Sequence, residues 1–218
     1  MSATLRPGLP PLPWRIARLP IDERGYPIPW FVSDVDGKRD FRLADGAKRV
    51  KAVRESICWV CGGYLGVHKT FAIGPMCAIN RVTSEPPCHT DCAVFSAIAC
   101  PFLSKPPSKR RTTGLPEDMP ESPGVMLDRN PGATCLWTTG TFAPFHVPNG
   151  WLIRLGQPTQ VEWYAKGRKA TRAEVVESVE SGMPVLMELA EKDGPEAVEA
   201  LLKAKRIAVE FYPVATSQ

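Results

Sequence analysis

Hydrophobic and polar positions follow first a strand-like and then a helix-like period near the start of the chain. Residues 30–43 alternate between apolar and polar, which predicts a β-hairpin with an Asp-Gly turn at 36–37. Over 44–57 the apolar residues recur at helical spacing, so a helix is expected there, capped by Asp45 and with Ala47, Val50, Val53 and Ile57 on one apolar face. This helix would lead the chain directly into a region rich in cysteine.

The second half of the chain continues a mixed α+β pattern. Three apolar runs bounded by proline and glycine are expected to be strands, namely residues 133–145, 150–156 and 160–167. Thr171 and Glu174 then form a T-x-x-E capping box, and Gly182 is expected to end the helix that they begin. Further helices are predicted over 184–192 and from Pro195 onward.

Proline marks the boundaries of this organisation. The chain has 23 prolines among 218 residues, about twice the usual share of ~5%. Residues 1–30 form a proline-rich extended arm whose aromatic side chains are expected to dock on the body. We therefore divide the chain into this arm, an α+β core at 31–103, a loop or linker at 104–132, and strands followed by helices at 133–212.

Composition and charge narrow the class of protein. The hydrophobic share of 44% and the charged share of 23% are ordinary for a globular domain. The sequence shows neither the apolar segment of a secretory signal nor a run of 18 apolar residues, which predicts a cytoplasmic protein without a membrane span. A net charge of +4 permits an anionic partner without requiring one.

The cysteines carry the strongest chemical signal. Six of the seven cysteines and two of the three histidines lie between Cys58 and Cys100. In a reducing cytoplasm this clustering favours metal ligands over disulfides. Cys58 and Cys61 form a C-x-x-C pair followed by two glycines, and His89 and Cys92 form an H-x-x-C pair behind a double proline. Three thiolates and one imidazole are a donor set that binds Zn²⁺ in a closed tetrahedron, so we expect these four residues to hold zinc.

The order of these features resembles a treble clef. A knuckle at 58–63 is followed by a predicted hairpin at 64–76, and the second ligand pair lies at the first turn of a helix expected to begin near Thr90. The expected fold is therefore α+β: a treble-clef-like zinc-binding core at 31–103 with short β-hairpins, the proline-rich N-terminal arm and C-terminal helices.

Other ligand sets stay open at this point. Cys88 can replace His89 in a Cys₄ site. Cys100, which precedes a proline, can complete an iron–sulfur cluster with the three other predicted cysteine ligands, although the usual C-x-x-C-x-x-C run is absent. Cys77 lies in a Gly-Pro turn and can also compete. For Cys77, Cys100 and Cys135 we favour simple burial, which is common for free cysteine.

Several basic or histidine-containing segments suggest nucleic-acid chemistry. His68 at the tip of the expected hairpin, with Asn80, suggests a metal-dependent nuclease or nucleotide-processing enzyme, although the histidine–asparagine–histidine set is incomplete. Near the capped helix, Arg168, Lys169 and Arg172 can hold an anion. Other basic residues can follow a nucleic-acid backbone, but aromatic residues do not alternate with them in the sequence: Lys48, Arg49, Lys51, Arg54, Lys69 and those within 105–111.

Four strings carry a resemblance to a known family: "CWVCGGYLG", "FAIGPMCAINRVTSEPPCHTDCA", "ACPFLSKP" and "WYAKGRKATRAEVVESVESG". They resemble segments of an uncharacterised family of small bacteriophage and prophage proteins, over roughly residues 25–200. The resemblance implies a phage-related protein of the host cytoplasm and supplies no activity. Our leading hypothesis is a zinc-stabilised protein that binds a host protein or nucleic acid, with the oligomeric state open. The alternatives are the nuclease or nucleotide-processing enzyme and an iron–sulfur protein.

Overall fold

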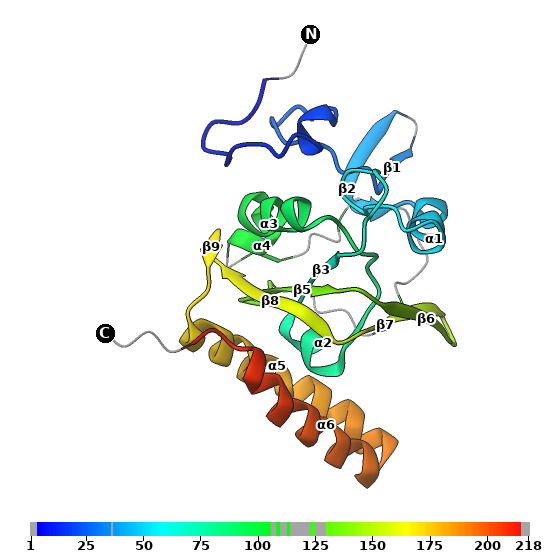
Figure 1. The fold of residues 1–218 in the computed structure, drawn as a ribbon, viewed down its shortest axis with the longest axis vertical. Coiled ribbons are helices and arrows are strands. Elements are labelled where there is room, and N and C mark those ends of the chain that lie inside the picture. Colours follow the sequence, from blue (N-terminus) through cyan, green and yellow to red (C-terminus); the bar gives the residue numbers. More distant parts are fainter. Residues whose placement is uncertain are drawn as a thin grey trace.

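Two antiparallel sheets and a separate hairpin form the frame of the protein, seen in a computed structural model of the chain (Figure 1). The structure describes residues 4–35, 37–105, 108–109, 113, 123–124 and 130–214. Most of the linker predicted at 104–132 therefore lies outside the described residues, as does Asp36 of the predicted turn.

The elements alternate between strands and helices, which confirms the α+β class. The strands are β1 (Val32–Val35), β2 (Lys38–Ala44), β3 (Lys69–Ile73), β4 (Val82–Thr83), β5 (Thr134–Thr139), β6 (Phe142–Val147), β7 (Gly150–Leu155), β8 (Pro158–Ala165) and β9 (Arg168–Lys169). The helices are η1 (Ile16–Arg18), α1 (Gly46–Arg54), α2 (Pro75–Asn80), α3 (Thr90–Ala99), α4 (Pro101–Ser104), α5 (Arg172–Asp193), α6 (Pro195–Ala208) and η2 (Val209–Phe211). The strand orders are β1-β2, β3-β5-β8-β9 and β4-β7-β6.

The four-stranded sheet separates two layers of helices. Helix α3 contacts β3, β5 and β8 on one face, while α2 contacts β5 from the other face and packs against α5 and α6. Figure 1 shows α3 and α4 above this sheet and α2, α5 and α6 below it, with the N-terminal arm above α3. The predicted segments 31–103 and 133–212 share both larger sheets, because β3 pairs with β5 and β4 pairs with β7.

The central strand β5 supplies side chains to two separate hydrophobic cores. Successive side chains of a strand point to opposite faces. Cys135 and Trp137 belong to a core that includes α2, α5 and α6, which we call the helical core, and Leu136 belongs to a second core on the α3 face. The second core, here the cysteine core, has these buried members: Ile16, Cys58, Val60, Cys88, Cys92, Ala93, Phe95, Ala97, Ala99, Leu136 and Tyr164.

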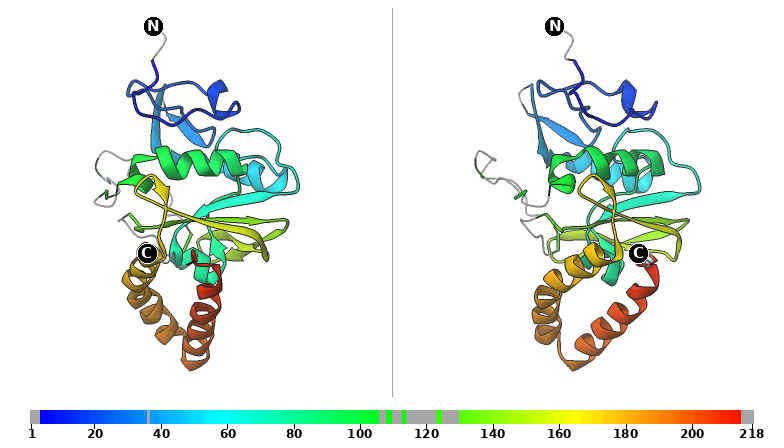
Figure 2. Two further views of the ribbon diagram at one scale, coloured as in Figure 1. Left: turned by 60° about the vertical axis from the view of Figure 1, so that its left-hand side comes forward. Right: turned by 90° about the vertical axis from the view of Figure 1, so that its left-hand side faces the viewer.

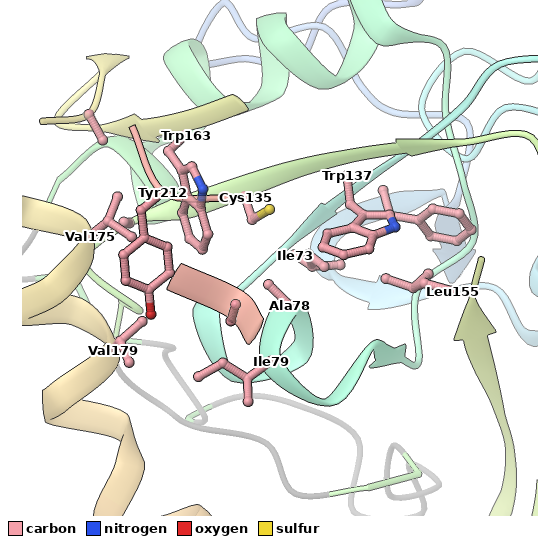
Figure 3. Packing of buried hydrophobic residues seen from close by; sticks show 14 of the residues in the cluster. Ile73, Ala78, Ile79, Cys135, Trp137, Leu155, Trp163, Val175, Val179 and Tyr212 are labelled. Atoms are coloured by element: carbon pink, nitrogen blue, oxygen red, sulfur yellow. The ribbon is translucent and has the colours of Figure 1, made fainter. Parts of the chain in front are cut away.

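Aromatic side chains fill the helical core (Figure 3). The rings of Trp163 and Tyr212 meet edge to face with centroids 6.0 Å apart, and those of Trp137 and Phe211 meet at 5.2 Å. Each indole also donates a hydrogen bond, Trp137 to the carbonyl of Gly156 and Trp163 to that of Phe211. Because a buried indole N–H needs an acceptor, the Trp163 bond ties the C-terminal segment to the sheet, and the Trp137 bond holds the connection between β7 and β8.

The predicted hairpin and helix at 30–57 are confirmed, apart from the face that the helix buries. β1 and β2 pair antiparallel, and the Asp45 carboxylate accepts a hydrogen bond from the Lys48 backbone N–H as the cap of α1. Of the predicted face, Val53 packs against the helical core and Ile57 is buried, whereas Ala47 is exposed and Val50 is 42% exposed, so the burial expected of these two is wrong. Ala52, which lies off that face, is completely buried.

The predicted hairpin at 64–76 is wrong. Within this segment only β3 is a strand, and it pairs with β5, where Thr70 faces Thr138. Tyr64 makes a single isolated bridge with Ile57. A strand's partner can come from any distance along the chain, so the local pattern identified the strand but not its neighbour.

The predicted strand at 133–145 is two strands that belong to different sheets. β5 ends at Thr139 and β6 begins at Phe142. Between them the Thr141 N–H donates to the Thr139 hydroxyl, and the Thr141 carbonyl accepts from the Gly156 N–H. These bonds support a bend at Gly140 that takes the chain from one sheet into the next.

The C-terminal helices begin as predicted, but the first one does not end at Gly182. Thr171 and Glu174 form the predicted capping box, and α6 starts at Pro195. Helix α5 continues past Gly182 and Pro184 to Asp193, so the separate helix predicted over 184–192 is part of it. A Cβ at Gly182 would lie 2.8 Å from Met76 Sδ, so this glycine allows α2 to approach closely.

The N-terminal arm docks on the body, as predicted, although not with every aromatic side chain. Ile16 is 1% exposed in the cysteine core, and the Arg15 guanidinium contacts the Asp91 carboxylate of α3 at 3.0 Å. Phe31, just beyond the arm, stacks on Trp59 with centroids 5.0 Å apart. Trp14 remains 58% exposed.

Among the residues that the structure describes, no helix has both the length and the apolar character needed to cross a membrane.

Candidate metal centre

The first ligand pair lies in a tight knuckle directly after α1. The Gly62 N–H donates to the Cys58 carbonyl at 2.9 Å, and the Cys58 N–H donates to the Gly63 carbonyl at 2.7 Å. Gly62 has φ +74°, and a Cβ there would lie 2.6 Å from the Trp30 ring. Glycine is required here because it tolerates positive φ and leaves room for the indole. The knuckle thereby turns the thiols of Cys58 and Cys61 to the same side.

The second ligand pair lies at the start of α3. His89 is the N-cap residue and Cys92 is in the first turn, as predicted from the double proline. The preceding segment is held between two neighbours: Cys88 exchanges both backbone hydrogen bonds with Thr70 of β3, and the Trp59 N–H of the knuckle donates to the Pro87 carbonyl. Because the helix dipole favours negative charge near its N-terminus, Cys92 is well placed as a thiolate.

The structure brings the four predicted ligands together. The sulfur atoms of Cys58, Cys61 and Cys92 and a ring nitrogen of His89 all lie within 4.8 Å of one another. A tetrahedral zinc with sulfur ligands at about 2.3 Å has ligand atoms roughly 3.7 Å apart. Cys58 and Cys92 are fully buried, and Cys61 and His89 are partly buried. This cluster could hold one metal ion, enclosed on most sides by protein.

The hydrogen bond of His89 determines which ring nitrogen can bind a metal. Its Nε2 lies 3.0 Å from the Tyr64 carbonyl oxygen, and its Nδ1 lies 3.4 Å from Cys61 Sγ. A carbonyl oxygen can only accept, so Nε2 must carry the proton. The Nδ1 lone pair therefore points into the cluster, and the Tyr64 carbonyl is an outer partner of the kind that orients metal-binding histidines.

The three thiols are close enough to control one another's ionisation. Hydrogen bonds from Cys58 and then Cys92 lower the pKa of Cys61 to about 2, while the pKa of Cys58 is raised to about 11, chiefly by its hydrogen bond to Cys61. The hydrogen bond with Cys58, followed by the one with Cys61, raises the pKa of Cys92. The backbone N–H groups of Cys61 and His89, each 3.4 Å from Cys58 Sγ, add donors that suit thiolate sulfur.

The other cysteines lie outside this cluster. Cys88 is buried and its thiol donates to the Thr70 carbonyl at 3.1 Å. Cys100 is at the opposite end of α3, about 12 Å along the helix from Cys92 by the usual rise per residue. Cys77 and Cys135 pack in the helical core. The structure therefore assembles neither the alternative Cys₄ set with Cys88 nor the iron–sulfur set with Cys100.

His68 and Asn80 do not face each other across one site. His68 is exposed just before β3, and Asn80 is exposed at the end of α2, so the whole of β3 and α2 lies between them. Asn80 instead lines a groove of about 940 Å³ between α2 and the α5–α6 pair. This arrangement gives the nuclease hypothesis no support.

Most of the basic residues singled out in the sequence have structural partners. Arg49 donates to the carbonyls of Ser84 and Trp151 and lies over the Trp151 ring at 3.7 Å. Lys48 donates to the Val32 carbonyl. Near the capped helix, Lys166 and Arg168 form ion pairs with Glu174, and Lys169 forms one with Glu162. Arg172 donates a hydrogen bond to the Pro213 carbonyl. These contacts leave the predicted anion site beside α5 without support.

Two contributors to the centre have little or no signal in the sequence. The Tyr64 carbonyl orients His89, and any residue type supplies a carbonyl. Ile16 covers the cysteine core from the arm, and an isolated apolar residue among prolines does not indicate what it packs against.

Comparisons of the chain with protein-family models, with curated proteins and with solved structures found no match. The geometry and chemistry of the four-residue cluster are therefore the basis for a functional proposal.

Proposed function

We propose that the protein is a zinc-stabilised binding protein of the phage type, in which Cys58, Cys61, His89 and Cys92 hold Zn²⁺ in a structural role. The observation that supports this best is the His89 tautomer, because its Nδ1 lone pair points to the three sulfur atoms. Three thiolates and one imidazole suit zinc, which prefers sulfur and nitrogen ligands in a tetrahedron.

The number of protein ligands favours a structural role over a catalytic one. Catalytic zinc usually keeps one position for water or substrate, whereas four protein ligands complete a tetrahedron. The arm adds to this enclosure, since Ile16 packs in the same core as Cys58 and Cys92. The zinc would join the knuckle to the start of α3, and the arm would pack beside them through Ile16.

The treble-clef comparison is supported by two of its three parts. The knuckle at 58–63 and the ligand pair at the start of α3 are present. The part between them is the single strand β3, which pairs with β5 instead of forming a local hairpin. The core is therefore treble-clef-like in its ligands, with its strand joined to a larger sheet.

The proposed activity is binding of a host protein or nucleic acid in the host cytoplasm. The test is metal analysis of protein purified without added metal. We expect about one zinc per chain, no iron and no colour in an anaerobic preparation. Protein that folds without zinc or iron would contradict the proposal. Cleavage of DNA or RNA with Mg²⁺, lost in His68→Ala, would favour the nuclease instead.

A further inference from the structure

The most exposed large apolar side chains are concentrated near the candidate metal centre. Apart from Val214 close to the C-terminus, the three highest exposures among the described residues belong to Tyr64 at 76%, Val67 at 74% and Trp14 at 58%. Exposed aromatic side chains cost solvation free energy, and such groups on a stable surface mark interaction sites. Tyr64, Val67 and Trp14 are therefore candidates for an interaction site.

Both aromatic residues flank the first turn of α3. The Tyr64 carbonyl accepts a hydrogen bond from His89, and Arg15, the neighbour of Trp14, contacts Asp91 two residues further along the same turn. Figure 2 shows η1 and the loop that follows α1 next to each other above this end of α3 in both views. Trp14 and Tyr64 therefore lie in two segments that both contact the first turn of α3.

Each aromatic side chain extends from a fixed backbone. Trp14 lies in a turn that is closed by hydrogen bonds from the N–H groups of Ile16 and Ala17 to the Pro13 carbonyl. Tyr64 is held by its bridge with Ile57 and by the bond to His89. A side chain on a fixed backbone loses little conformational entropy on binding.

Positive charge accompanies both aromatic side chains. The guanidinium groups of Arg15 and Arg18 lie 4.5 and 4.8 Å from the centroid of the Trp14 ring. None of the ion pairs within the described ranges includes Arg18. The Lys69 ammonium braces the loop after Tyr64 by donating to the carbonyls of Gly66 and Val67. The charges next to Trp14 come from its own turn, and Lys69 lies five residues after Tyr64.

We infer that this surface binds single-stranded nucleic acid. We call it the aromatic rim, and its members are Trp14, Arg18, Tyr64, Val67 and Lys69. This inference rests on the proposed function and names its partner. A base can stack on the exposed part of the Trp14 indole or of the Tyr64 phenol ring, while Arg18 and Lys69 attract the phosphates. More than half of Trp14 and of Tyr64 is open, which suits a flat stacking partner better than a protein side chain that needs a pocket.

The test uses the full-length, metal-loaded chain and a fluorescein-labelled oligothymidylate or oligouridylate of about 20 nucleotides. Fluorescence anisotropy should show binding that weakens as salt rises. Trp14→Ala and Tyr64→Ala should each weaken binding roughly 5- to 100-fold. Arg18→Ala should also reduce the slope of log K against log salt by about 0.7. Val176→Ala, at an apolar residue on α5 that is 40% exposed, is the control and should leave binding unchanged.

Three results would overturn the inference. One is a metal-loaded protein that does not bind either oligonucleotide. Another is binding that Trp14→Ala and Tyr64→Ala leave unchanged. The third is equal competition by polyglutamate, which would identify an acidic protein as the partner. Zinc content and thermal stability are measured for every variant, so loss of the metal, which contradicts the proposed function, is distinguished from loss of this surface alone.

Discussion

Cys88 and His89 are neighbours in the chain, but their side chains serve different structures. The Cys88 thiol donates to the Thr70 carbonyl at 3.1 Å, whereas His89 Nδ1 lies 3.4 Å from Cys61 Sγ. One residue fixes the segment to β3 and the next points into the metal centre. The two roles can be separated by substitution.

Cys58→Ser should remove the metal and Cys88→Ser should retain it. Serine is a poor zinc ligand, so the first variant loses the stability that metal binding contributes, at least about 3 kcal/mol. In the second variant the hydroxyl can still donate to the Thr70 carbonyl. The measurement is zinc content by atomic emission with thermal unfolding, with and without a chelator. Loss of zinc in both variants would show that Cys88 is a ligand.

Ile16→Ala should destabilise the fold by about 2–5 kcal/mol, because it opens a cavity in the cysteine core. Ile16 is 1% exposed and packs with Cys58 and Cys92. Trp14→Ala, two residues earlier on the exposed side of the arm, should change the free energy of unfolding by less than about 0.5 kcal/mol. Urea unfolding measures both. Equal effects would mean that the arm does not dock through Ile16.

Arg49→Ala should cost about 2–3 kcal/mol, since Arg49 donates to two carbonyls and stacks on Trp151. Arg49→Lys should recover little of this, because an ammonium group lacks the planar fork of donors. Lys51→Ala, on an exposed position of the same helix, is the control. Chemical denaturation provides the measurement, and a neutral effect of Arg49→Ala would contradict the structural role of this residue.

Glu174→Gln should reduce stability at pH 7 by about 1 kcal/mol, and the difference from the wild type should shrink as the pH falls. Hydrogen bonding to Arg168, followed by the Thr171 N–H, holds the pKa of Glu174 below its usual range. The unfolded chain therefore takes up this proton first, and the stabilisation is lost as the pH falls below about 4.3. Gln still caps the helix, so the comparison isolates the charge.

The matched control for this prediction is Glu188→Gln on the same helix. Among the residues that the structure describes, the ion pair of Glu188 is with the exposed Lys192, so its replacement should have no measurable effect at pH 7 or at lower pH. A difference between Glu174→Gln and the wild type that does not change with pH would contradict the assigned ion pair.

The cluster of Cys58, Cys61, His89 and Cys92 was predictable because the spacing within each pair is local, whereas the pairing of the strands was not. Two cysteines separated by two residues and followed by glycine indicate a knuckle, and the double proline indicates where α3 begins. The partner of β3 depends on residues far along the chain. Gly182 was misjudged for the same reason, because its role is the approach of Met76, which a pattern within one helix does not record. Local capping at Asp45 and Thr171 was correct since it involves only near neighbours.

The central position of β5 has a consequence for the order in which the protein forms. Thr70 of β3 bonds to Thr138 of β5, 68 residues later in the chain. During synthesis, a nascent chain that ends before β5 already contains both ligand pairs and the bridge between Thr70 and Cys88, but the edge of β3 that pairs with β5 stays open. Closing so large a loop is entropically costly and slows folding. A ribosome-bound fragment that stops at residue 130 should therefore capture zinc while remaining prone to aggregation, until the next few residues emerge and seal the sheet.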